Sequence, residues 1–383
     1  MESMQSWFGI KEGHRDFSIE NDADSRLFFA RHDLNVQLMA ILKRSFRTGN
    51  PPKMVLYGDW GVGKTHTMRH IQYVLETRGD DFPATVVFVE LPDIAGKSTF
   101  HVAHAGLLDA LGIDRAREWV LKYRTIHGGA TREKIQDATQ SGDIAMAFES
   151  LLGYGESGRI AWDWLRGVSL NAGDARLVGL PSVMDQSNQL VRTLQMLGRL
   201  CQAAEEKLLV FMLDEATKLM FVSNADAINH WMNAFKLIAD SQSKEVGFIV
   251  SGSWVDPDDM AMPLQDPQVM SRFGESNYIR LTNLDEQSTQ EFLSALLSEW
   301  VDATLRKQII DRHSAEADGE AVNEGTYPFT YEGLVVAAQY ACRNGGITTP
   351  RDIQKMVDDL LNRAIDDGRH IVSSRYILSL IGA

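Results

Sequence analysis

The eight residues from Gly58 to Thr65, Gly-Asp-Trp-Gly-Val-Gly-Lys-Thr, complete the phosphate-binding pattern G-x-x-x-x-G-K-[ST]. In this pattern backbone N–H groups surround the phosphates, Lys64 reaches the terminal phosphates, and the Thr65 hydroxyl binds Mg²⁺. The sequence therefore predicts a site for ATP or GTP with Mg²⁺. The residues expected to contact the nucleotide are Gly58, Asp59, Trp60, Gly61, Val62, Gly63, Lys64, Thr65 and His66.

The segments on either side of this loop support the interpretation. Residues 54–57 are apolar and predict a buried strand, and residues 65–76 predict a helix. A strand followed by the loop and a helix directs the helix N-terminus at the phosphates. The alternative, a glycine-rich turn without a ligand, leaves this order of elements unexplained.

Two adjacent carboxylates follow a second apolar segment. Residues 208–213 predict a strand, and Asp214 and Glu215 come directly after it. Ligands of open α/β sheets bind at the carboxyl ends of the strands. We expect Asp214 to hold Mg²⁺ together with Thr65, and Glu215 to orient and deprotonate the attacking water, because phosphoryl transfer depends on positioning and charge neutralisation. The alternative is an acidic strand end that faces solvent.

Two serines follow the next predicted strand, residues 246–250. Ser251 or Ser253 is expected to donate a hydrogen bond to the attacking water if the strands have the usual order. The alternative is a turn of small residues that leaves a buried strand.

An arginine ends a short predicted helix that Asp266-Pro267 begins and Gly274 terminates. In that place Arg272 could enter the site of a neighbouring subunit and stabilise charge in the transition state, an effect that can be worth ~10³ or more in rate. The alternative is a cation that interacts favourably with its own helix dipole.

A second arginine stands at the start of a predicted helix, after Thr349-Pro350. The helix dipole disfavours a cation there by about 0.3 to 1 kcal/mol. The placement of Arg351 therefore indicates an anionic partner, for which the nucleotide phosphate is the candidate.

The composition fits a globular protein of one large and one smaller module, since the chain has 383 residues and 44% hydrophobic content. The sequence has no apolar run near ~18 residues and no basic and apolar leader, so we expect a soluble, cytoplasmic protein without a membrane segment. Cys201 and Cys342 lie in apolar helical contexts, which predicts buried thiols rather than a disulfide or zinc site.

The net charge of −14 argues against a surface that binds nucleic acid throughout. DNA, if bound, would contact a local basic patch. The alternative is that these basic residues lie on solvated helix faces, balanced by acids such as Asp114, Glu118 and Glu133. The candidate basic residues are Lys43, Arg44 and Arg47, and the run Arg115, Arg117, Lys122, Arg124, Arg132 and Lys134.

Apolar strands alternate with helices over most of the chain, which predicts an α/β fold with a parallel five-stranded sheet sandwiched by helices. A helix over 33–47 precedes the first strand. After residue 284 the pattern is purely helical, with helices expected over 285–312, 331–343 and 350–366. The expected strands are 54–57, 85–91, 208–213, 246–250 and 278–282.

These patterns predict a division into an N-terminal extension (1–24), a nucleotide-binding core (25–283) and a C-terminal helical lid (284–383). Residues 98–206 are too long for a simple crossover and predict a helical insertion. Its Trp162 and Trp164 are expected to be packing anchors rather than a platform for a ligand.

The motifs and their order resemble those of the AAA+ ATPases, in particular the branch of origin-recognition and loader ATPases. The helix ahead of Gly58–Thr65 is similar to that branch's helix before its Walker A loop. The resemblance implies ATP with Mg²⁺, hydrolysis shared between subunits, and a homo-oligomer. The resemblance assigns Asp214-Glu215 to Walker B, Ser251 to Ser253 to sensor 1, and Arg272 to the arginine finger. It assigns Gly346 together with Pro350-Arg351 to sensor 2.

Two features depart from that branch. Glu90 and Asp93 stand where many relatives have a polar residue that restrains the Walker B glutamate, and no winged helix follows the lid. In this layout the chain looks more like transposon-encoded AAA+ regulators, and the segment from Trp164 to Gly167 is similar to ATPases of phage-defence islands. The expected function is ATP-dependent self-assembly into a ring or filament. This assembly would act together with another protein to remodel or regulate a DNA-linked complex.

The sequence leaves one alternative function open and disfavours another. A nucleotide-gated scaffold would bind ATP to order its assembly and hydrolyse it slowly or incidentally. A GTPase switch is disfavoured, because the sequence has no guanine-reading element like Asn-Lys-x-Asp.

Overall fold

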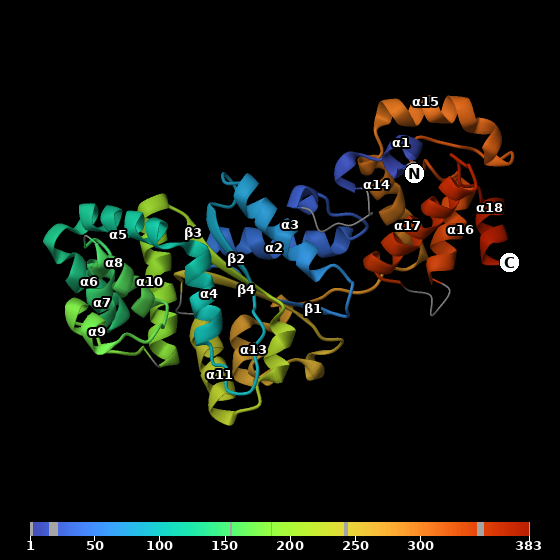
Figure 1. Ribbon diagram of the computed structural model, residues 1–383. Helices are drawn as coiled ribbons and strands as arrows, with labels where there is room; N and C mark the ends of the chain where they lie inside the picture. Colours follow the sequence, from blue (N-terminus) through green and yellow to red (C-terminus); the bar gives the residue numbers. More distant parts are fainter. Residues whose placement is uncertain are drawn as a thin grey trace. The chain divides into compact units, whose positions relative to one another are not determined.

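The computed structural model describes residues 3–14, 22–153, 155–184, 186–240, 244–342 and 348–382 (Figure 1). The chain forms two compact units. Unit 1 comprises Met1–Gln37, Asp59–His70 and Leu281–Ala383, and unit 2 comprises Leu38–Gly58 and Ile71–Arg280. The sequence-based division at residues 24/25 and 283/284 remains a proposal.

Unit 2 contains a parallel five-stranded sheet, which confirms the predicted α/β fold. The strand order is β2-β3-β4-β1-β5. The fourth strand extends to Ser253, beyond its predicted end, because Gly58 pairs with Ser253 in register. The strands are β1 (Lys53–Gly58), β2 (Ala84–Glu90), β3 (Leu208–Asp214), β4 (Val246–Ser253) and β5 (Tyr278–Arg280).

Alternate side chains of the strands point to opposite faces, as the period of a strand requires. On one face, Val55, Phe211 and Val250 belong to a core shared with the helices α4, α10 and α11. Met54 and Met212, on the other face, are fully buried as well. The parts of α2 (His32–Thr48) and α3 (Lys64–Thr77) within unit 2 lie on that side (Figure 1).

The region 98–206 is helical, as predicted. The helices α4 and α10 pack against β2 and β3, whereas α5 to α9 pack on one another and on α10 (Figure 1). Trp164 is fully buried and Trp162 nearly so, which confirms both as packing anchors. The helices are α4 (His101–Leu111), α5 (Ile113–His127), α6 (Thr131–Thr139), α7 (Gly142–Ser150), α8 (Glu156–Leu165), α9 (Ala172–Val178) and α10 (Ser187–Glu205).

The α-helices that follow β3 in the described part of unit 2 are α11 (Ala225–Ala239), α12 (Met262–Gln265) and α13 (Pro267–Phe273). The last begins and ends as the sequence predicts. The Asp266 carboxylate accepts hydrogen bonds from the backbone of Gln268 and Val269, and Gly274 follows the helix with a positive φ.

Unit 1 has a helical core of its own, built around Trp300, Phe329 and Leu361. The predicted helix over 285–312 is divided at Val301 into α14 and α15. Two short helices, α1 and α18, were not predicted, because each spans only one or two turns and offers little periodicity. The helices are α1 (Met4–Phe8), α14 (Glu286–Trp300), α15 (Ala303–His313), α16 (Tyr331–Cys342), α17 (Pro350–Asp366) and α18 (Ser374–Ile381).

Both cysteines are buried and free, as predicted, and burial raises the pKa of the Cys201 thiol to about 11. Over the described ranges, none of the helices has both the length and the apolar character needed to cross a bilayer.

Candidate functional site

The carboxyl ends of three neighbouring strands bring the predicted residues of unit 2 to one edge of the sheet. Gly58, the last residue of β1, pairs with Ser253 of β4, and β4 pairs with β3, which ends at Asp214. Because the strands are parallel, their carboxyl ends meet at the same edge. The phosphate-binding loop follows directly in the chain, since Asp59 comes after Gly58.

Asp214 is held in a fixed orientation at this edge. The Ser251 hydroxyl donates a hydrogen bond to its Oδ1 atom, and the backbone N–H of Glu215 donates to the same oxygen at 2.9 Å. Asp214 is 3% exposed and Ser251 is fully buried. A buried carboxylate with one oxygen bound in this way is well suited to offer the other to a cation.

The two serines of the predicted sensor position therefore differ. Ser251 contacts Asp214, whereas the backbone N–H of Ser253 donates to Oγ1 of Thr217 at 2.5 Å. The structure thus gives Ser251 a positioning contact that the sequence did not predict. That either hydroxyl bonds the attacking water stays a prediction.

Glu215 has a left-handed backbone conformation, with φ 59° and ψ 31°. Residues other than glycine seldom adopt left-handed backbone angles, and the few that do cluster at functional sites. The conformation ends β3 abruptly and turns the chain into a short 3-10 helix (Ala216–Phe221). The left-handed Glu215 marks this strand end as a candidate catalytic position.

The phosphate-binding loop has the conformation its glycines allow. Gly61 and Gly63 have φ values of +79° and +89°, which side chains with a Cβ rarely adopt. The Lys64 ammonium donates to the carbonyl oxygen of Asp59 at 2.7 Å, so it lies over the loop. Thr65 is exposed in the first turn of α3. The loop is therefore arranged to bind an anion at a helix N-terminus.

The start of α17 lies against this loop within unit 1. A Cβ added to Gly61 would come within 2.9 Å of Thr349 Oγ1 and 3.3 Å of Arg351 Cβ. Thr349 caps α17 as predicted, because its hydroxyl accepts from the backbone N–H of Asp352 at 3.1 Å. The exposed Arg351 thus stands beside the phosphate-binding loop, and its contact with phosphate stays a prediction. Gly346 of the same predicted pattern lies outside the described residues.

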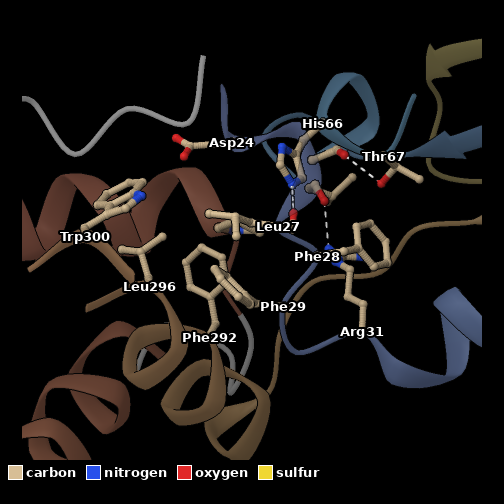
Figure 2. A pocket seen from close by; sticks show the side chains of 13 residues that line it. Asp24, Leu27, Phe28, Phe29, Arg31, His66, Thr67, Phe292, Leu296 and Trp300 are labelled. Carbon is tan, nitrogen blue, oxygen red and sulfur yellow. Dashed lines mark hydrogen bonds between the residues drawn. The ribbon is translucent and has the colours of Figure 1, made fainter. Parts of the chain in front are cut away.

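An apolar, aromatic pocket adjoins the loop (Figure 2). Val62 and Gly63 of the loop form part of its wall, and all its lining residues belong to unit 1. The remaining lining residues come from the segment before α2, the first turn of α3, α14 and the start of α17: Asp24, Leu27, Phe28, Phe29, Arg31, His66, Thr67, Phe292, Leu296, Trp300 and Pro350.

Arg31 fixes one side of the pocket. Its guanidinium donates to the carbonyl oxygens of Val62 at 2.7 Å and Thr282 at 2.9 Å. Burial lowers the pKa of Arg31 to about 10, so the group is charged at neutral pH. The contact with Val62 couples this arginine directly to the backbone of the phosphate-binding loop.

Two histidines of α3 hold the segment before α2 in place. The ring of His66 bonds the carbonyl oxygen of Leu27 (Figure 2). The ring of His70 bonds the carbonyl oxygen of Ser25 at 3.0 Å. Phe28 stacks on His70 with ring centroids 4.6 Å apart. Burial lowers the pKa of His66, which keeps it neutral near pH 7. A neutral His66 donates from Nε2, since a carbonyl oxygen only accepts.

Arg272 lies in unit 2 at the end of α13, where the sequence predicts it. It is exposed and donates to the carbonyl oxygen of Lys236 at 3.2 Å. Its role toward a second subunit stays a prediction.

Most of the second basic run is engaged in local contacts. Arg115 pairs with Glu205 at 3.1 Å, Arg117 with Asp114 at 3.7 Å, and Arg132 with Glu149 at 3.6 Å. Lys122 donates to the carbonyl oxygen of Ala204. These contacts favour the alternative of balanced helix faces for this run. Lys43, Arg44 and Arg47 of the first group are exposed on α2.

Of the residues that line the pocket, the sequence predicted only Val62, Gly63 and His66 as nucleotide contacts. The other lining residues come from separate segments, and no spacing pattern joins residue 24 to residues 292–300. One signal was present, since the apolar triplet Leu27-Phe28-Phe29 stands between charged residues ahead of a helix.

No protein-family model and no curated protein matches the sequence. Among solved structures the chain is similar to Cdc6p from Pyrobaculum aerophilum, at 13% identity and a TM-score of 0.47, covering 95% of this chain and 69% of that one. It is also similar to the ORC2 protein of Aeropyrum pernix (14% identity, TM-score 0.43, covering 92% and 67%). A third structure is the RuvB Holliday junction branch migration motor of Thermotoga maritima (13%, 0.38, covering 92% and 68%).

Proposed function

We propose that the protein is an ATPase of the AAA+ type that binds ATP with Mg²⁺. The observation that carries the proposal is the shared wall of loop and pocket: Val62 and Gly63 belong both to the phosphate-binding loop and to the adjoining aromatic pocket. An anion site joined to an apolar pocket matches the two ends of a nucleotide, its phosphates and its base.

The oxygen donors fit Mg²⁺, which prefers carboxylate, hydroxyl, phosphate and water ligands. Asp214 and Thr65 would hold the ion, which would neutralise phosphate charge when bound. Lys64 and Arg351 would contact the phosphates, and Glu215 would orient the attacking water and accept its proton. Ser251 would keep Asp214 in the orientation that binds the ion.

We further propose that the protein assembles with itself, as a ring or filament, and that Arg272 completes a neighbour's site. The task would be to remodel or regulate a DNA-linked complex of a mobile element or defence system. This part of the proposal is supported by the resemblance of the motifs and their order. The exposed residues Lys43, Arg44 and Arg47 would be the first candidates for DNA contact.

Calorimetry tests nucleotide binding with two ligands, ATP and inorganic tripolyphosphate, the second of which lacks base and ribose. Lys64→Ala should weaken both ligands, because it removes charge from the phosphates. Phe29→Ala should weaken ATP by about tenfold or more and leave tripolyphosphate unchanged, since burying an aromatic ring against the base would contribute about 1.5 to 3 kcal/mol. Lys307→Ala, on the exposed face of α15, is the matched control for Lys64→Ala. Equal loss of both ligands in Phe29→Ala would contradict the base pocket.

A turnover assay separates the regulator from the nucleotide-gated scaffold. Hydrolysis that DNA stimulates supports the regulator, whereas tight ATP binding without turnover, with or without DNA, supports the scaffold. Tighter binding of GTP than of ATP would revive the GTPase switch.

A further inference from the structure

Three potential metal ligands meet in unit 1, away from the phosphate-binding loop in the sequence. His313 is the last residue of α15, Glu316 lies in the short 3-10 helix that follows (Ser314–Ala317), and His370 stands between α17 and α18. One ligand atom from each, two imidazole nitrogens and a carboxylate oxygen, lie within 4.8 Å of one another.

The Glu316 carboxylate lies close to both imidazoles. Its Oε1 atom is 2.7 Å from His313 Nδ1 and 3.5 Å from His370 Nδ1. A tetrahedral ion with ligand bonds of about 2.0 to 2.1 Å separates its ligand atoms by roughly 3.3 Å. The two distances lie on either side of that value, and the two imidazole nitrogens lie within 4.8 Å of each other. The two rings are stacked, so the His313 ring must turn out of the stack for both nitrogens to face one ion.

Backbone hydrogen bonds orient Glu316 independently of the histidine side chains. Its other oxygen, Oε2, accepts from the backbone N–H groups of His370 at 2.5 Å and Ile371 at 3.3 Å. The carboxylate is therefore held by one oxygen and presents the other to the two Nδ1 atoms. Metal sites use such supporting bonds to fix their ligands.

Ring stacking fixes His370. Its imidazole is stacked on Trp7, with centroids 4.1 Å apart, and on His313, with centroids 3.7 Å apart. Trp7 is itself anchored, because its indole N–H donates to the carbonyl oxygen of Arg369 at 2.8 Å. His313 is the more exposed of the two histidine side chains, at 29% against 18%, so its ring is the one that adjusts to an ion.

The nearby charges also favour a cation. Asp318 and Glu320 follow Glu316 in the chain. Arg369 pairs with Asp318 at 3.2 Å, and Arg375 interacts with it electrostatically.

We propose that His313, Glu316 and His370 bind one Zn²⁺ ion, with water as the fourth ligand. Two imidazole nitrogens and one carboxylate oxygen form a donor set typical of zinc, whereas Mg²⁺ and Ca²⁺ favour oxygen ligands alone. The ion would tie the end of α15 to the segment between α17 and α18. It would thereby stabilise the helical part of unit 1.

The test is calorimetric titration of ZnCl₂ into the metal-stripped full chain at pH 7.5. We expect one site per chain, with Mg²⁺ in excess unable to compete. His370→Asn and Glu316→Gln should each weaken this site at least about tenfold, because loss of even a supporting partner costs about 10- to 100-fold in affinity. His127→Asn, at the end of α5 in unit 2, is the matched control and should bind normally.

Glu316→Gln keeps an oxygen for the backbone N–H groups of His370 and Ile371, so it separates ligand loss from unfolding. Co²⁺ gives a second readout, since a tetrahedral Co²⁺ site absorbs visible light and Glu316→Gln should lose that spectrum while its circular dichroism is kept. Zn²⁺ binding that is absent from the folded wild type, or unchanged in both site variants, would overturn the proposal.

Discussion

Gly61 of the phosphate-binding loop and Thr349 at the start of α17 lie so close that a Cβ on Gly61 would be 2.9 Å from the Thr349 hydroxyl oxygen. The loop backbone at Gly61 is therefore packed closely against the side chains of Thr349 and Arg351. A movement of the loop toward the helix start would meet these side chains. Gly61 is thus the position at which steric change should couple most directly to the nucleotide site.

Gly61→Ala should weaken ATP binding and lower stability. The new methyl group would meet Thr349, and the φ of +79° adds strain of about 1 to 2 kcal/mol. Gly49→Ala is the matched control, since Gly49 has a φ of +65° but no neighbour within 4 Å. It should carry the backbone strain alone and leave ATP affinity unchanged. Equal ATP affinities in the two variants would refute the importance of the contact.

The sequence predicted the sheet and its edge well, because local patterns carry that information. An apolar run such as 208–213 followed by Asp214 and Glu215 specifies both a buried strand and its functional end. The contact between Gly61 and Thr349 has no such local signature. It joins residues nearly three hundred positions apart. The spacing of residues along a sequence does not show which distant segments lie close together in the fold.

The same reasoning explains why Ser251 was assigned only to the attacking water. Its hydrogen bond to Asp214 arises from the pairing of β3 with β4, in which Leu213 stands opposite Val250. The helix starts at Asp266 and Thr349, by contrast, depend on bonds within three residues and were predicted correctly.

Glu215→Gln should retain ATP binding and lose at least ~10²-fold in turnover, because an amide cannot accept the proton of the attacking water. Steady-state hydrolysis and calorimetry measure the two properties separately. Glu206→Gln is the control, since Glu206 also has a left-handed backbone, with φ 59°, but follows α10. Turnover near the wild-type rate in Glu215→Gln would remove this residue from the mechanism.

Ser251→Ala should raise the Mg²⁺ concentration needed for half-maximal turnover. The variant removes the hydroxyl that orients Asp214 while leaving the carboxylate itself. Ser253→Ala is the comparison, and it should leave the Mg²⁺ dependence unchanged. If Ser251 instead bonded the attacking water alone, its variant would lower kcat at every Mg²⁺ concentration without shifting the midpoint.

The lowered pKa of His104 should decrease the free energy of unfolding of unit 2 in mild acid. Burial lowers its pKa from 6.5 to about 4, although its ring donates to the carbonyl oxygen of Leu165 at 2.7 Å. Between these values the unfolded chain holds a proton that the folded chain does not, so stability falls as the pH drops from 6.5 toward 4. The loss should approach about 3 kcal/mol, at 1.36 kcal/mol for each pKa unit.

Urea unfolding at pH 7 and pH 4.5 measures this dependence. His104→Gln keeps a donor for Leu165 but does not titrate, so the difference between the two pH values should shrink in the variant. An undiminished difference would assign the acid sensitivity to other groups.

Arg272 tests whether sites are shared between subunits. Arg272 is exposed at the end of α13. Within the described part of the chain its guanidinium donates a hydrogen bond to one backbone carbonyl oxygen, that of Lys236. Arg272→Ala should therefore leave ATP binding by the monomer intact while it lowers turnover and ATP-dependent assembly, by ~10³ in rate if it acts as an arginine finger. Arg280→Ala, which removes another exposed arginine from the same unit, is the control and should remain active.

Mixing decides between a shared and a self-contained site. Arg272→Ala and Glu215→Gln are each expected to be inactive alone, but a mixed interface can join an intact Glu215 to an intact Arg272 from the other subunit. The mixture should therefore recover part of the activity, and wild-type turnover per chain should rise with protein concentration as subunits assemble. Turnover that is independent of concentration and insensitive to Arg272→Ala would instead indicate a nucleotide site complete within one chain, because no group from a second subunit would then be needed.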